Sequence, residues 1–230
     1  RRNYMPILAL YFLSLPGTLA HQIGLYTAIG TAAGFLAEIP SGYLADRLGH
    51  RRVLVIARYS MVLSTFCFLV GDGFWWFVAG AVGISIGFAF SSGAHDAFIH
   101  ETLLALKRGR SYGRVRARIS ATASLMSGAV IIALPLLASF SLSLPLAVVF
   151  VTDCIGLFVA LSFVSPPQRL ATFTTLRQLF IDIRRAPLPG FYPVAIFSSL
   201  VAASLVSLSP FREPLLRELG LPLTLVGLVM

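Results

Sequence analysis

Charged residues and cysteines are both scarce in this sequence, and each scarcity argues against a class of protein. Asp, Glu, Lys and Arg make up only 12% of the 230 residues, whereas 57% are hydrophobic. A soluble domain of this size does not need so much apolar surface, so we expect a bilayer to be the solvent of this chain. Both cysteines, Cys67 and Cys154, fall inside apolar runs, which argues against a disulfide framework.

The motifs of nucleotide, metal and hydrolytic chemistry are also missing. We find no glycine-rich phosphate-binding loop, no His or Cys cluster at metal-ligand spacing and no nucleophile triad. We therefore expect no enzymatic activity, no cofactor, no bound metal and no ATP-driven transport. Lysine is nearly absent as well: Lys107 is the only one among eighteen basic residues, which is typical of a GC-rich bacterial source.

Long apolar runs predict an all-α, polytopic membrane helix bundle. Polar, Gly or Pro breaks separate the runs, which cover residues 3–15, 22–44, 53–70, 74–99, 119–139, 145–164, 190–209 and 223–230. A full span needs roughly 20 residues. The first run is shorter than that and the eighth stops at Met230, so we expect the chain to begin and end within longer helices.

Residues 166–189 differ in composition from the runs on either side. Apolar residues recur there at helical intervals among arginines, as in an amphipathic helix lying on a membrane surface. We therefore expect three units: a six-helix bundle over residues 1–165, a central cytoplasmic loop over 166–189, and the start of a second bundle over 190–230.

Small residues recur at helical spacing in the second and fourth runs. Such residues let neighbouring helices approach closely in a bilayer. They are Gly30, Gly34 and Ala37 in one run, and Gly80, Gly83 and Gly87 in the other.

The net charge of +9 would suggest nucleic acid in a soluble protein, but its distribution here indicates membrane orientation instead. Sixteen of the eighteen basic residues lie at the N-terminus, between Arg47 and Arg58, between Lys107 and Arg118, or between Arg169 and Arg185; the other two are Arg212 and Arg217. Cytoplasmic loops carry such an excess. We therefore expect these segments in the cytoplasm and the chain in the inner (plasma) membrane, with no nucleic-acid partner.

The stretch E-I-P-S-G-Y-L-A-D-R-L-G-H-R-R, residues 38–52, joins two membrane-length runs. Gly49 can take a positive φ and end a helix there. The spacing Gly42-x-x-x-Asp46-Arg47-x-Gly49, followed by basic residues, resembles the loop between helices 2 and 3 of the major facilitator superfamily. The resemblance implies two six-helix halves built from inverted three-helix repeats, with substrate bound at mid-depth between the halves.

In that family the loop is thought to pair with helices of the other half and to hold the outward-facing state. An Asp near a helix end can pair with basic groups or accept from exposed backbone N–H groups. His50 stands where the family usually has Arg, so either Arg51 or Arg52 replaces it or the contact depends on pH. The alternative is a loop that only sets topology. The candidate gating residues are Gly42, Asp46, Arg47, Gly49, His50, Arg51 and Arg52.

Three acidic residues are candidates for a charge network around this loop. Glu38 precedes Pro40 and either stabilises a kink or takes part in gating. The run from Ser92 to Glu101 resembles the family stretch in which an acidic residue joins the network, and Asp96 or Glu101 would fill that place. The alternative is a hydrated helix end.

Asp153 lies eight residues into the sixth run, near mid-depth. Desolvation there would favour its neutral form, so that it could take up and release a proton near neutral pH. Asp153 is therefore the candidate proton-coupling residue. The alternative is a structural carboxyl that bonds to Thr152 or to a neighbouring helix.

These observations predict a secondary active transporter that works by alternating access. We expect proton-coupled efflux of a small molecule, with membrane lipid around it. The Arg-containing signature of the fourth span in drug/proton antiporters is absent, since residues 80–87 contain no Arg, and so is the Gly-Pro-rich signature of the fifth. Proton-coupled metabolite uptake, and a non-transporting sensor or assembly protein with this fold, remain the alternatives.

Overall fold

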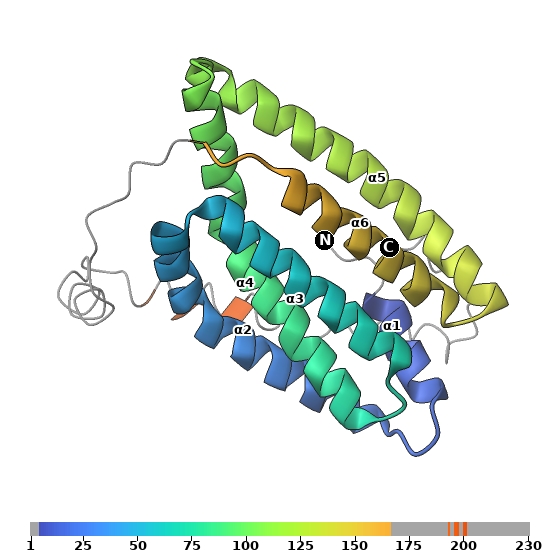
Figure 1. Ribbon diagram of the computed structural model, residues 1–230. Coiled ribbons are helices and arrows are strands. Elements are labelled where there is room, and N and C mark those ends of the chain that lie inside the picture. Colours follow the sequence, from blue (N-terminus) through green and yellow to red (C-terminus); the bar gives the residue numbers. More distant parts are fainter. Residues whose placement is uncertain (1–4, 167–192, 194–195, 198–199, 202–230) are drawn as a thin grey trace.

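The computed structural model describes residues 5–166, together with 193, 196–197 and 200–201 (Figure 1). These residues form helices and no strands, which confirms the predicted all-α bundle. The central loop and most of the second unit predicted from the sequence lie outside the described residues. The elements are α1 (Met5–Ser14), α2 (Ala20–Leu48), α3 (His50–Val70), α4 (Phe74–Ala105), the short 3-10 helix η1 (Gly109–Ser111), α5 (Tyr112–Phe140) and α6 (Leu144–Ser162).

Four described helices are long and apolar enough to cross a membrane: α3, α4, α5 together with η1, and α6. The second helix becomes a fifth if its two parts form one span, because it bends by 45° between Glu38 and Pro40. Proline removes a backbone hydrogen bond inside a helix, which accounts for a bend at this place.

Two helix ends extend beyond the sequence prediction. The fourth run was expected to end at residue 99 and the fifth to begin at 119, but α4 continues to Ala105 and α5 starts at Tyr112. The turn between them is short, and Lys107 has a φ of 56° within it. The polar stretch is therefore mostly helical. Hydropathy shows only where a helix leaves the hydrocarbon core of the membrane. The same helix can continue into water, because several charged residues are good helix formers.

Small residues bring α4 close to both of its neighbours, which confirms the packing predicted from the sequence. A Cβ added to Gly30 would lie 2.8 Å from the Ala81 carbonyl oxygen, and one added to Gly80 would overlap the Phe68 ring. At the second contact, the Ser64 hydroxyl donates a 2.6 Å hydrogen bond to the Gly80 carbonyl oxygen. In lipid, the hydrophobic effect does not drive helices together. Close backbone approach of this kind lets van der Waals packing hold the helices together instead.

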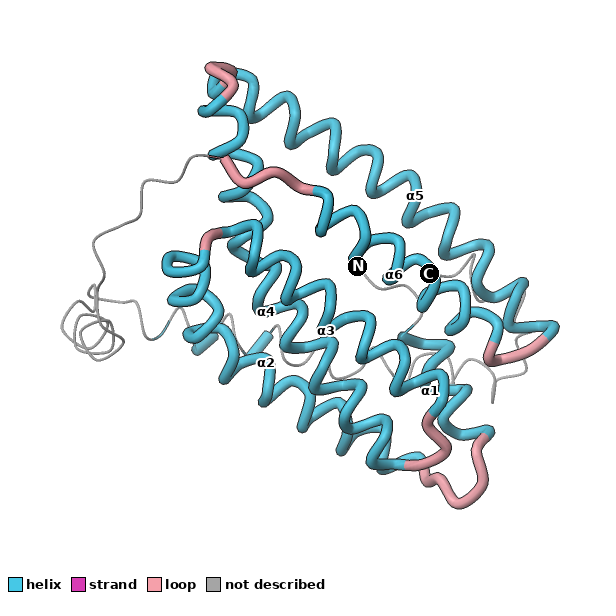
Figure 2. The backbone as a smooth tube through the Cα atoms, viewed as in Figure 1, coloured by secondary structure: helices cyan, strands magenta, loops and turns pink. Residues whose placement is uncertain are grey.

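The main apolar core lies at the end of the bundle away from the α2–α3 junction. Aromatic rings from four helices meet there, with ring centroids 4.7 Å apart for Phe12 and Phe77 and 5.4 Å apart for Phe12 and Tyr26. The opposite end carries the α2–α3 and α4–α5 connections and their arginines, and we call it the basic end. Figure 2 shows these connections as short loops at the ends of the helices.

The fifth helix lies at the edge of the bundle, alongside α6 (Figure 1). Its buried residues are Leu134, Pro135 and Ala138, all near its C-terminal end. Its N-terminal half therefore needs other contacts to hold it against α4.

Candidate functional site

The α2–α3 junction consists of one residue, Gly49. Its φ is 88°, and it ends α2 and precedes the first residue of α3. The Gly49 N–H donates to the Ala45 carbonyl oxygen at 3.0 Å, and the Val53 N–H donates to Gly49 at 3.3 Å. Since this conformation favours glycine, the prediction that Gly49 takes a positive φ and ends a helix is confirmed.

The junction places His50 against the C-terminal end of α4. The His50 Nδ1 lies 3.0 Å from the Glu101 Oε1, with side-chain exposures of 17% and 32%. The two atoms are close but are not aligned as a hydrogen bond. Of the two acidic candidates for this place, the structure brings Glu101 to the junction, because α4 continues as a helix past residue 99.

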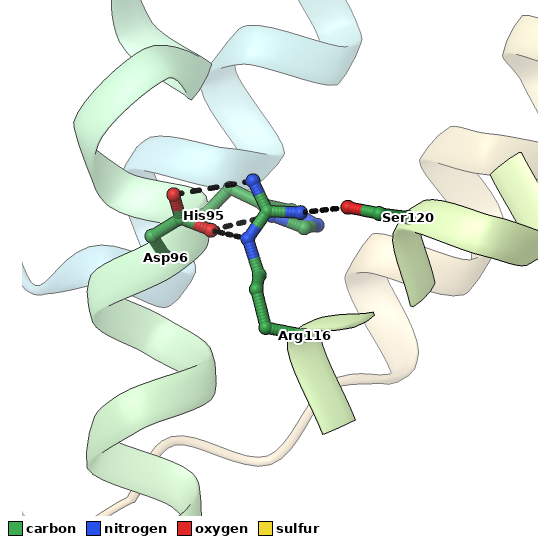
Figure 3. Close-up of polar contacts among 4 residues, drawn as sticks. All are labelled: His95, Asp96, Arg116 and Ser120. Carbon is green, nitrogen blue, oxygen red and sulfur yellow. Dashed lines mark hydrogen bonds and ion pairs between the residues drawn. The ribbon is translucent and has the colours of Figure 1, made fainter. Parts of the chain in front are cut away.

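Asp96 faces a different partner, Arg116 at the start of α5 (Figure 3). Its Oδ1 lies 2.6 Å from Arg116 Nε, and its Oδ2 accepts from Arg116 Nη2 at 3.4 Å. The guanidinium also donates to the Ser120 hydroxyl at 2.9 Å, and His95 Nδ1 lies 3.7 Å from the carboxylate. This cluster joins the N-terminal half of α5 to α4.

Sequence reasoning did not single out Arg116. It is one of six basic residues between Lys107 and Arg118, and no local pattern separates it from the other five. Its partner lies on another helix, so only the packing of α5 against α4 identifies it. Arg51 was named as a candidate gating residue, but only the packing shows its contact: it donates a 2.7 Å hydrogen bond to the Leu161 carbonyl oxygen at the end of α6.

Three of the candidate gating residues, Gly42, Asp46 and His50, line a small hollow between α2 and α4. Asp46 and Glu38 are exposed at its rim. Within residues 5–166, the Asp46 carboxylate makes no ion pair. Arg47 donates to the Tyr43 hydroxyl at 3.3 Å, and Arg52 is exposed. The hollow has a volume of about 270 Å³ and is lined by Glu38, Ser41, Gly42, Ala45, Asp46, His50, Ala89, Phe90, Ser92, Gly93 and Ala94.

A larger space, which opens to the surface past exposed residues such as Met126, lies among α3, α4, α5 and α6 and has a volume of about 720 Å³; we call it the internal cavity. Asp153 is on its wall and is only 8% exposed. The neighbouring Thr152 hydroxyl donates to the Val149 carbonyl oxygen at 2.7 Å. The cavity thus brings together Asp153, the Asp96–Arg116 pair and Arg58 of α3. In the part of the chain that the structure describes, no group of three or more His, Cys, Asp or Glu residues could hold a metal ion.

The fold and these sites define a multi-pass α-helical membrane protein with polar groups gathered at one end and around an internal cavity. The chain belongs to the major facilitator superfamily, because the family model described as Major Facilitator Superfamily matches residues 1–230. The uncharacterized MFS-type transporter YqjV of Bacillus subtilis (strain 168) is 28% identical over 73 residues. That match covers 32% of this chain and 18% of the relative, so the chain aligns with less than a fifth of that relative. No solved structure matches significantly.

Proposed function

We propose that this chain is part of a secondary active transporter that moves a small molecule across the plasma membrane by alternating access, with a proton as coupling ion. The observation that carries the proposal is Asp153, a buried carboxyl on the wall of the internal cavity. An ionisable residue is costly in hydrocarbon and marks ion or substrate pathways in membrane proteins. The cavity volume of about 720 Å³ falls within the range of small-molecule sites, roughly 300–1,000 Å³.

The α2–α3 junction supplies the second part of the proposal. His50 and Glu101 form one contact inside the described half, and the exposed Asp46 is left to pair across the interface with the other half. Such a contact favours one of two global states, which is the property that alternating access requires. We therefore assign Asp46, His50 and Glu101 to a latch between states.

The proposed direction is efflux, with the basic end of the bundle in the cytoplasm. The concentration of basic residues in the α2–α3 and α4–α5 connections supports this orientation through the positive-inside rule. In proton-coupled uptake the proton and the solute move in the same direction, whereas in efflux they move in opposite directions. An experiment that follows proton movement therefore separates the two.

Proteoliposomes that hold the full-length protein and a trapped pH-sensitive dye test the function. We expect one or more members of a solute panel to drive proton movement, and Asp153→Asn to abolish that movement while solute exchange persists, since exchange needs no net protonation change. Asp72→Asn is the matched control, because Asp72 is exposed in the α3–α4 turn, away from the cavity. Proton and solute moving in the same direction would establish uptake instead. Absence of flux for every solute, in protein that remains folded, would contradict transport.

A further inference from the structure

The α4–α5 connection, which projects from the basic end of the bundle, carries positive charge without matching negative charge (Figure 1). Five basic side chains there are exposed and make no ion pair or hydrogen bond within the part of the chain that the structure describes: Lys107, Arg108, Arg110, Arg114 and Arg118. The sequence has no acidic residue between Glu101 and Asp153, and Glu101 itself lies at His50. Residues 166–189 contain four arginines and one aspartate. Neither the described half nor this next segment therefore supplies the negative charge that would complement the connection.

Two of these arginines begin one continuous face of α5. Residues four and seven positions apart lie on the same side of a helix, within about 40° of each other. The side chains on this side, which we call the outer face of α5, are Arg114, Arg118, Leu125, Ile132 and Leu136. The three apolar ones are between 46% and 77% exposed. Arg116, which pairs with Asp96, and the buried Leu134 lie on the opposite side, toward the rest of the bundle.

A neighbouring face of α5, roughly a quarter turn away, carries small residues instead. They are Ala117, Ala121, Ser124 and Gly128. Nothing lies within 4 Å of a Cβ added to Gly128, so this face is open in the described half. Small residues allow another helix to approach closely in a bilayer, whereas leucine and isoleucine are as apolar as lipid tails. The small face is therefore suited to packing against a further helix, and the outer face to contact with lipid.

The depth of the two arginines matches the layer of lipid headgroups. The apolar run over residues 119–139 rises about 30 Å, which is the thickness of the hydrocarbon core. Arg118 precedes this run directly, and Arg114 is about 6 Å farther out, within a headgroup layer that is roughly 5–8 Å thick. Leu125 lies about 10 Å inside the hydrocarbon, at a depth that the acyl chains of the same leaflet reach.

We propose that the outer face of α5 binds an anionic phospholipid from the leaflet at the basic end. Arg114 and Arg118 hold the phosphate, because guanidinium groups donate several hydrogen bonds in the geometry of phosphate oxygens and stay charged. An acyl chain lies along Leu125. The bound lipid also gives the N-terminal half of α5 a contact on a side where no described residue covers it. This site is independent of whether the protein carries a solute.

Native mass spectrometry of the purified full-length protein tests this site, in titrations with phosphatidylglycerol and with phosphatidylcholine of the same acyl chains. We expect phosphatidylglycerol to bind more tightly. Arg114→Gln combined with Arg118→Gln should weaken it on the order of tenfold, since each loses its attraction to the anionic headgroup. Lysine at both positions should retain most of the affinity, which separates lost charge from lost folding. Arg47→Gln with Arg52→Gln is the matched control, because it removes the same charge from exposed side chains at the same end of the bundle.

Hydrogen exchange over residues 112–126 locates the lipid. Phosphatidylglycerol, and not phosphatidylcholine, should slow exchange there in the wild type but not in the Gln variant. Equal affinity for the two lipids, or unchanged affinity in the Gln variant, would overturn the proposal. An equal loss in the control would overturn it too, because binding would then be a general attraction to the positive end. Exchange that is already slow without lipid would show that another part of the full-length protein covers the outer face.

Discussion

The His50 imidazole lies 3.0 Å from the Glu101 carboxylate, and this contact joins the first residue of α3 to the last turns of α4. The contact is an ion pair only when both imidazole nitrogens carry a proton. A strong contact at the end of the bundle favours the state in which α3 and α4 stay together there.

We expect His50→Arg to strengthen this contact and Glu101→Gln to remove it. Arginine carries a permanent positive charge beside the Glu101 carboxylate, whereas glutamine at position 101 carries no charge. If the contact favours one of two global states, the two variants should shift the transport rate in opposite directions. Equal transport rates in both variants and in the wild type would exclude the pair from the latch.

Asp46→Asn should slow turnover severely while leaving substrate affinity within a few-fold of normal. The carboxylate is exposed and pairs with no described residue, so its removal shifts a population of states rather than damaging a pocket. Substrate affinity of the isolated protein and thiol labelling of single cysteines on the extracytoplasmic side provide the measurements. Normal turnover with a normal labelling pattern would show that the junction only sets the membrane topology.

Gly42→Ala should leave stability unchanged or raise it by up to about 1 kcal/mol, because alanine is the better helix former and nothing lies within 4 Å of the added Cβ. If the other half packs against Gly42, turnover should nevertheless fall. Thermal unfolding and transport of the full-length protein separate the two effects. Gly128→Ala, also in open space but outside the hollow, is the control for the substitution itself.

Gly80→Ala should destabilise the protein by about 1–3 kcal/mol. The added Cβ would overlap the Phe68 ring, which is 1% exposed and has no room to move. Gly93→Ala on the same helix meets no neighbour and serves as the matched control. The midpoint of thermal unfolding in detergent is the measurement. Equal midpoints for the two variants would show that α3 and α4 are not packed this closely.

Asp96→Asn should release the N-terminal half of α5 from α4 at a cost of less than about 1 kcal/mol, because both side chains are partly exposed. Hydrogen exchange over residues 112–120 should become faster. The double reversal, Asp96→Arg with Arg116→Asp, should restore the slow exchange, since the two charges face each other in either order. If both variants exchange like the wild type, the pair does not hold α5.

The sequence by itself determined the fold class and the family. Hydrophobic runs of membrane length leave only helices as spanning elements, because every backbone group in lipid must find its partner within the helix. The same local logic applies at Gly49, where one residue with positive φ ends α2. These features depend on the chain within a few residues of each position, so they can be read from its order alone.

Tertiary structure alone decided which charges meet. Both Asp96 and Glu101 suit the junction by sequence, yet they are five residues apart on α4 and so face different neighbours, Arg116 and His50. The internal cavity is likewise absent from any one segment, because residues of four helices form it, with Arg58 on α3 and Asp153 on α6. Ion-pair partners and cavity walls depend on the rotation and separation of packed helices. Those quantities are set by side-chain packing between segments distant in the chain, and no local pattern encodes them.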